Sequence, residues 1–149
     1  GVPVVTAASA ARDAVAALGL QRLVVATPYG VGSNGIVARY LASIGIEVAA
    51  IAGLDLDRSP EVWKREVPAL TPQQVCDLGL SIDGPAAQAL YLPCTGLASI
   101  EAIELFERRT GKPALSSVQA GFWASLRRLG VDGRRTGAGR LLANWPELP

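Results

Sequence analysis

Residues 22–35 read RLVVATPYGVGSNG, and this stretch decides the fold. The run Leu23–Ala26 is apolar throughout, which is typical of a parallel strand covered on both faces. A glycine-rich loop follows, and a helix is predicted from about Asn34 to Ser43, with Gly45 as its terminator. A buried strand that leads through a loop into a helix is the repeating unit of an α/β fold.

The same alternation continues in both directions from this stretch. Further strands are predicted at 46–54, 89–92 and 113–116, with a short strand or extended entry at 2–6. Further helices are predicted at 7–18, 59–67, 73–80, 99–109 and 118–129, and a loop rich in Gly and Arg follows the last one. The order predicts an α/β domain with a mainly parallel sheet, helices on both faces and right-handed crossovers.

Cys94 lies where the predicted strand 89–92 gives way to the helix 99–109. A thiol at a helix N-terminus faces unpaired N–H groups, which lower a cysteine pKa and can hold an oxyanion. Ligands of parallel sheets bind at the carboxyl ends of strands, where Tyr29 also lies. We therefore expect Cys94 to be reachable from solvent, in one crevice with Tyr29. A buried structural cysteine is the alternative.

Composition narrows the function classes. The chain has 149 residues, 18% charged residues, a net charge of +1 and no histidine. Without histidine, serine–histidine catalysis and the commonest metal ligand are absent. The basic residues form no stripe and no apolar run reaches membrane-spanning length, so neither a nucleic acid nor a membrane is an expected partner. Two cysteines, Cys76 and Cys94, form no disulfide framework, which predicts the cytoplasm as the location.

The glycine loop offers a competing interpretation. Gly30 to Gly35 spells G-x-G-x-x-G after a strand, and Asp55 follows where a ribose-binding acid could stand. Against a dinucleotide site, Pro28 and Tyr29 place bulky groups where the motif needs a tight turn. A nucleotide-binding module and a catalytically silent α/β module therefore stay open as alternatives.

Several stretches resemble the aspartate/glutamate racemase superfamily, in the branch that holds arylmalonate decarboxylases and maleate cis-trans isomerases. They occur in the family's order over nearly the whole chain: RLVVATPY at 22–29 with Asn34, LPCTGL at 92–97, GKPALSS at 111–117, QAGFW at 119–123 and GAGRLL at 137–142. The resemblance implies a flavodoxin-like lobe of a two-lobed fold, in which two similar lobes enclose the active site. Each lobe supplies a strand-end cysteine, or in decarboxylase-type members a glycine on the first lobe.

By resemblance, the function is cofactor-independent chemistry on a small carboxylate or dicarboxylate through an enediolate-type intermediate. Cys94 would protonate that intermediate, and Tyr29, Thr95, Gly96 and Asn34 would bind the substrate. An arylmalonate decarboxylase-like activity is the main prediction. A maleate isomerase or a racemase that uses two cysteines is the alternative. No metal or other cofactor is implied.

The resemblance begins after the first lobe's catalytic loop. It implies a second lobe at residues 1–117, and a C-terminal helix and tail at 118–149 that return towards a first lobe. A complementing first lobe or a homo-oligomer is therefore an expected partner. Cys76 is expected in the core, Ser116 and Ser117 as helix caps, and Arg140 as a solvated tail residue that could otherwise meet a substrate carboxylate.

Overall fold

The computed structural model describes residues 4–149. Its strands are β1 (Arg22–Thr27), β2 (Glu47–Gly53), β3 (Ala89–Leu92) and β4 (Ala114–Ser116). Its α-helices are α1 (Ala7–Ala17), α2 (Val31–Ser43), α3 (Pro60–Glu66), α4 (Pro72–Ser81), α5 (Ser99–Thr110), α6 (Ser117–Arg128) and α7 (Gly139–Asn144), and a 3-10 turn, η1, spans Leu56–Arg58. The α/β alternation predicted from the sequence is confirmed.

The four strands form one parallel sheet in the order β2-β1-β3-β4. The apolar strand β1 lies inside the sheet because both its edges are paired, whereas β2 and β4 lie at the edges. An order in which the second strand precedes the first is that of the flavodoxin-like arrangement. The parallel direction brings the loops after β1 and β3 to the same edge of the sheet.

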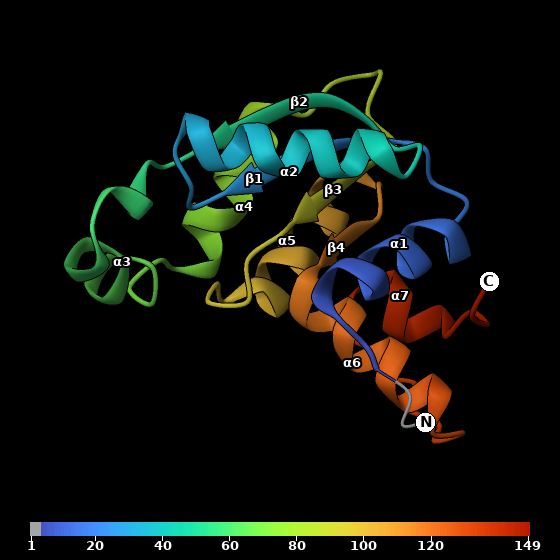
Figure 1. Ribbon diagram of the computed structural model, residues 1–149. Coiled ribbons are helices and arrows are strands. Elements are labelled where there is room, and N and C mark those ends of the chain that lie inside the picture. Colours follow the sequence, from blue (N-terminus) through green and yellow to red (C-terminus); the bar gives the residue numbers. More distant parts are fainter. Residues whose placement is uncertain (1–3) are drawn as a thin grey trace.

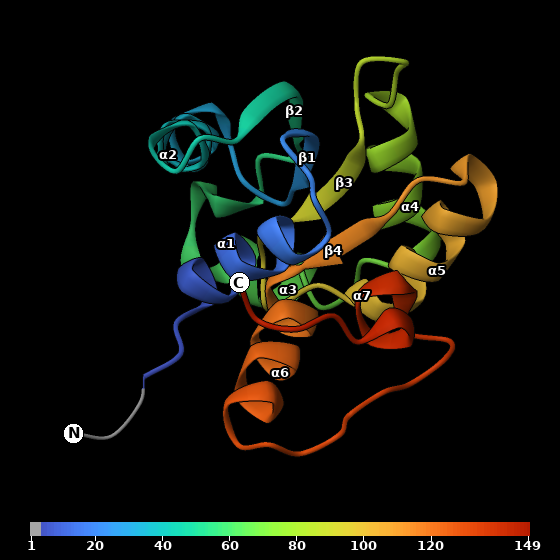
Figure 2. The same cartoon turned by 90° about the vertical axis from the view of Figure 1, so that its right-hand side faces the viewer.

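Helices cover both faces of the sheet, as Figure 2 shows with α1 and α2 on one side and α4 and α5 on the other. The alternation of side chains along β1 explains the two cores. Leu23 and Val25 belong to the apolar cluster that contains Trp123 of α6, whereas Val24 and Ala26 belong to the cluster that contains Phe106 of α5. Among residues 4–149, no helix is long and apolar enough to cross a membrane.

Two boundaries differ from the prediction at the start of the chain. Residues 2 and 3 of the predicted entry strand lie outside the described residues, and 4–6 form no strand. Thr6 instead caps α1, because its side chain accepts a bond from the N–H of Ser9 and its own N–H donates to Ser9 Oγ. Helix α2 begins at Val31, three residues before the predicted Asn34, because Gly30 already has the extended backbone of an N-cap.

The short helix α7 was not predicted, since its sequence is rich in glycine and arginine. Two carboxylates of α5 hold its first turn: Glu104 Oε1 accepts from the N–H of Gly139 at 2.7 Å, and Glu107 accepts from the N–H of Arg140 at 3.1 Å. Negative charge at a helix N-terminus stabilises the helix. The tail then packs on α6, where the Arg127 guanidinium lies 5.0 Å over the Trp145 ring.

Candidate functional site

Tyr29 and Cys94 meet at the carboxyl edge of the sheet. Tyr29 follows β1, and Cys94 follows the neighbouring strand β3. The Tyr29 hydroxyl donates to the carbonyl oxygen of Pro93 at 2.9 Å, which links the two strand-end loops directly. The expectation that the parallel sheet brings these loops together is confirmed by this bond.

The Tyr29 loop is fixed at each of its backbone polar atoms. The Tyr29 N–H donates to Thr27 Oγ1 at 3.0 Å, and its carbonyl accepts from the N–H of Asp55 at 3.3 Å and from Asn34 Nδ2 at 3.5 Å. A Cβ on Gly53 would overlap the Tyr29 carbonyl oxygen, so the neighbouring strand must carry a glycine there. The phenol is therefore held in place before any ligand arrives.

Cys94 is buried, with 3% of its surface exposed, which contradicts the expectation of a solvent-reachable sulfur. The residue belongs to the same buried apolar cluster as Val67, whose Cγ1 lies 3.3 Å from where a Cβ of Gly96 would stand. The Cys94 sulfur nevertheless has a polar contact. The N–H of Gly96 points at Cys94 Sγ over 3.4 Å.

That N–H donor lies closer to the cysteine in sequence than the predicted ones. Helix α5 begins at Ser99, and its N-cap Ala98 provides no side-chain cap, so the loop 94–98 separates the sulfur from the first turn. The Gly96 N–H therefore supplies the hydrogen bond that the sequence argument assigned to the helix N-terminus.

The pKa of the Tyr29 phenol depends on its burial and on the neighbouring Cys94. Partial burial, and then the neighbouring Cys94 sulfur, raise the pKa of Tyr29 well above its usual value. Both causes raise the pKa, because burial and a second acidic group nearby each disfavour a phenolate. Tyr29 is therefore a hydrogen-bond donor across the physiological range.

The other predicted substrate-binding residues divide into two groups. Thr95 and Gly96 are exposed beside Cys94, on the turn that follows β3. Asn34 is 8% exposed, and its Oδ1 accepts a bond from Thr27 Oγ1 at 2.6 Å. The amide of Asn34 thus faces the β1 loop and supports Tyr29 from within the protein.

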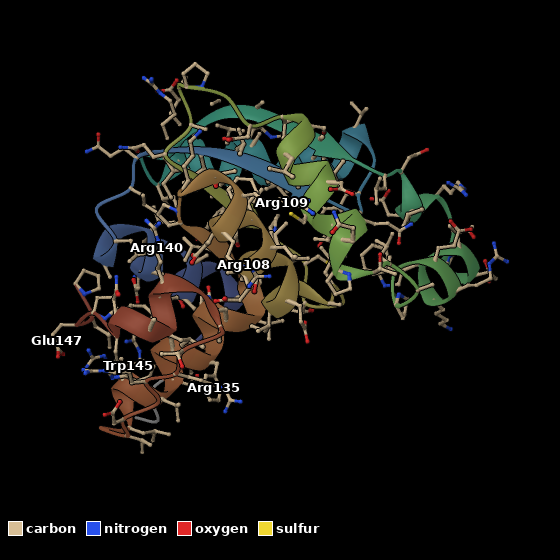
Figure 3. All side chains as sticks on the ribbon, turned by 180° about the vertical axis from the view of Figure 1, so that it is seen from behind. Arg108, Arg109, Arg135, Arg140, Trp145 and Glu147 are labelled. Carbon is tan, nitrogen blue, oxygen red and sulfur yellow. The ribbon has the colours of Figure 1, made fainter. Side chains whose placement is uncertain are left out.

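Three further residues have internal partners. Ser116 caps α6, since its Oγ accepts from the N–H of Gln119, and Ser117 Oγ lies 3.1 Å from the Tyr91 hydroxyl. Arg140 donates to the carbonyl of Gly111 at 2.6 Å, before β4 and therefore at the opposite edge of the sheet from Cys94. Figure 3 shows Arg140 on the side of the molecule away from α3.

The glycine loop is occupied from within the chain. The Asp57 carboxylate accepts from the N–H of Gly30 at 2.7 Å and from Ser33 Oγ, and these bonds lower the pKa of Asp57. In a dinucleotide site, a phosphate takes this position at the helix N-terminus. A carboxylate already placed there opposes a bound pyrophosphate, so the structure does not favour the nucleotide alternative.

Two contributors to the site were missed by sequence reasoning. Trp63 of α3 stacks on Tyr29 with 5.6 Å between ring centroids and 4° between planes, and Asp57 clamps the start of α2. The sequence analysis predicted only the short helix 59–67 that carries Trp63. The available signal was a large aromatic ring on a short predicted helix, because such a ring needs a packing partner.

A family model for arylmalonate decarboxylase matches residues 1–142. Among curated proteins, the arylmalonate decarboxylase of Bordetella bronchiseptica is 32% identical over 142 residues, which cover 95% of this chain and 58% of that protein. The chain therefore spans little more than half the length of this relative.

Solved structures of the same group of enzymes also match this chain. The maleate isomerase Iso of Pseudomonas putida S16 superposes with a TM-score of 0.86 at 31% identity, covering 96% of this chain and 56% of that one. A mutant of the Nocardia farcinica maleate cis-trans isomerase, solved with a covalently bound succinylcysteine intermediate, superposes with a TM-score of 0.84 at 29% identity over 93% of this chain and 55% of that one.

The family model covers residues 1–142, which include the β1 loop and the cysteine loop, and the structural superposition covers 96% of this chain. This chain belongs to the arylmalonate decarboxylase family, within the branch of the racemase superfamily that also holds the maleate isomerases.

Proposed function

We propose that this chain supplies the cysteine-bearing lobe of a cofactor-independent enzyme that acts on a small carboxylate or dicarboxylate in the cytoplasm, in the manner of an arylmalonate decarboxylase. The observation that carries the proposal is the meeting of Cys94 with the Tyr29 phenol at one edge of the sheet. A proton donor and a hydrogen-bond donor side by side suit a reaction in which negative charge develops on a carboxylate.

In the decarboxylation, the bond from the α-carbon to one carboxylate breaks and CO₂ leaves. Its electron pair stays on the remaining carboxylate as an enediolate. The Cys94 thiol then gives its proton to the α-carbon, and the thiolate takes a proton back from solvent. The Gly96 N–H, 3.4 Å from the sulfur, stabilises the thiolate between these two steps.

Tyr29 would hold the carboxylate that carries the enediolate. A phenol has one proton, so binding a substrate oxygen means leaving the carbonyl of Pro93. This exchange is favourable because a hydrogen bond to a charged oxygen is about twice as strong as one to a neutral carbonyl. The exposed Thr95 offers its hydroxyl and N–H to the same charge.

A maleate isomerase or a racemase is the second candidate. The covalent succinylcysteine in the Nocardia isomerase structure favours it, since it shows a cysteine of that relative adding to a four-carbon diacid. Both candidates use the same lobe. They differ in what faces Cys94 from the first lobe, a cysteine in isomerases and racemases or a glycine in decarboxylases.

We also propose that a first lobe covers an apolar face of this chain. Residues 118–149 would pack towards that lobe. Two largely apolar hollows of about 250 and 270 Å³ open at the surface, one beside Pro93 and one beside Phe122, which is 52% exposed. In the second hollow, the buried Gln119 Oε1 has no hydrogen-bond partner among residues 4–149. A covering lobe of the length that the relatives carry in addition would bury these groups.

The test uses the complete reading frame that encodes these residues. Purified protein is assayed for CO₂ release from phenylmalonate and for fumarate formation from maleate, as wild type and with Cys94→Ser. A glycine in the upstream strand-end loop together with CO₂ release supports the decarboxylase. A cysteine together with fumarate formation supports the isomerase, and full activity of the Cys94→Ser variant rejects both.

A further inference from the structure

Helix α3 is unusual in this fold because none of its residues is buried. In Figure 1 it projects beyond the strand ends, away from the other helices. Yet it carries Trp63, whose ring lies parallel to that of Tyr29 at 5.6 Å between centroids. The one large ring of this helix therefore contacts the residue that the candidate site depends on.

The Trp63 ring packs on a face of the Tyr29 ring that no hydrogen bond of Tyr29 constrains. The Tyr29 backbone is fixed by Thr27 and Asp55, and its hydroxyl is bound to Pro93, but these bonds leave the ring faces unconstrained. A parallel ring on one face restricts rotation of the phenol ring about the bond between Cβ and Cγ, and it blocks displacement of the ring towards that side. Hydroxyl direction and ring plane are then set together.

The segment that carries Trp63 is anchored at both ends. Before α3, Asp57 binds the N–H of Gly30 and the hydroxyl of Ser33 at the start of α2. After α3, Val67 is 1% exposed and packs against Gly96, next to Cys94. We call residues 55–67 the α3 arm. It spans from the Tyr29 loop to the Cys94 loop.

We propose that Trp63 is a positioning residue, which acts through the Tyr29 ring to hold the phenol beside Cys94 and to limit access to the sulfur. The inference rests on the proposed function for its catalytic consequence. Its structural part concerns only the packing of three side chains. Trp63 touches the phenol and needs no contact with substrate.

The experiment measures the rate at which iodoacetamide alkylates Cys94, followed by peptide mass spectrometry, in the complete protein. Trp63→Leu removes the stacked ring, Trp63→Phe keeps a smaller one, and Lys64→Ala changes an exposed neighbour on the same helix. We expect the Leu variant to react about two- to tenfold faster, from the stabilisation typical of an aromatic pair. The Phe and Lys64 variants should stay near wild type.

A double-mutant comparison decides whether Trp63 acts through Tyr29. In the Tyr29→Leu background, the increment from Trp63→Leu should shrink towards one, because the ring it positions is gone. An increment that persists at full size shows that Trp63 shields the sulfur directly, which overturns the positioning role. An unchanged alkylation rate in the single Trp63→Leu variant overturns it too.

Steady-state kinetics separate this inference from the proposed function. A positioning role predicts that Trp63→Leu lowers kcat with a smaller change in KM, and that Trp63→Phe restores kcat. A loss confined to KM contradicts that role. If Cys94→Ser leaves turnover intact while the alkylation results hold, the catalytic proposal fails and the packing inference stands.

Discussion

The two cysteines of the chain lie on the same side of the sheet and in the same apolar cluster, yet their surroundings differ. Cys76 on α4 is fully buried, and Arg109 Nη1 lies 3.8 Å from its sulfur. Cys94 is almost as buried, but a backbone N–H points at its sulfur and a phenol lies beside it. Burial alone therefore does not distinguish the two cysteines, whereas the group that points at each sulfur does: an arginine at Cys76 and a backbone N–H at Cys94.

The largest expected difference between the two cysteines is catalytic. Cys94→Ser should lower kcat by about 10²–10⁴-fold, the usual contribution of a placed proton donor, while Cys76→Ala should leave kcat within about twofold. Steady-state assays on phenylmalonate and maleate measure both variants side by side. Equal losses of kcat in the two variants would show that both substitutions act through folding and that Cys94 has no special chemical role.

The Tyr29 hydroxyl should give the next largest effect. Tyr29→Phe keeps the ring stacked on Trp63 but removes the donor, so kcat/KM should fall about tenfold or more, as for the loss of a hydrogen bond to a charged group. The matched control is Tyr40→Phe, whose hydroxyl donates to the carbonyl of Ala8 instead. A wild-type kcat/KM in the Tyr29→Phe variant would show that the Tyr29 hydroxyl does not bind the substrate.

Two glycines near the Tyr29 loop should respond in opposite directions. Gly53→Ala forces a Cβ into the Tyr29 carbonyl and should cost about 1–3 kcal/mol of unfolding free energy. Gly32→Ala, in α2 with open space around it, should stabilise the protein by about 0.5–1 kcal/mol. Urea denaturation measures both. A stable Gly53→Ala protein would mean that the loop is not held as tightly as its bonds indicate.

The smallest effect concerns the pH dependence of Cys76. Burial raises the pKa of its thiol, so the folded state keeps the proton to higher pH than the unfolded state does. The unfolding free energy should therefore fall as the pH rises through the folded-state pKa. Urea titrations at increasing alkaline pH should show a weaker decline in Cys76→Ala than in wild type. Identical slopes would contradict this assignment.

The sequence predicted those parts of the fold whose signals are local. The apolar run of β1 and the Gly45 that ends α2 each act within a few residues. Helix α7 escaped prediction because its first turn is held by Glu104 and Glu107, which lie more than thirty residues earlier in the chain.

In the candidate site, too, the sequence predicted what local signals and the parallel strand order determine. The strand ends place Tyr29 and Cys94 at one edge, which follows from the parallel order alone. The sequence left the burial of Cys94 open between two alternatives, because the residue is buried in a cluster with Val67, which belongs to another segment of the chain. The role of Asn34 also depends on a contact with Thr27 that spacing does not reveal.

The central claim is that the Cys94 sulfur does the chemistry. The most direct measurement is stepwise alkylation of the complete protein with iodoacetamide, with turnover and peptide-resolved labelling followed in the same samples. Turnover should fall in proportion to the fraction of Cys94 that is modified and be indifferent to label on Cys76. Undiminished turnover in protein whose Cys94 is fully alkylated would contradict the account.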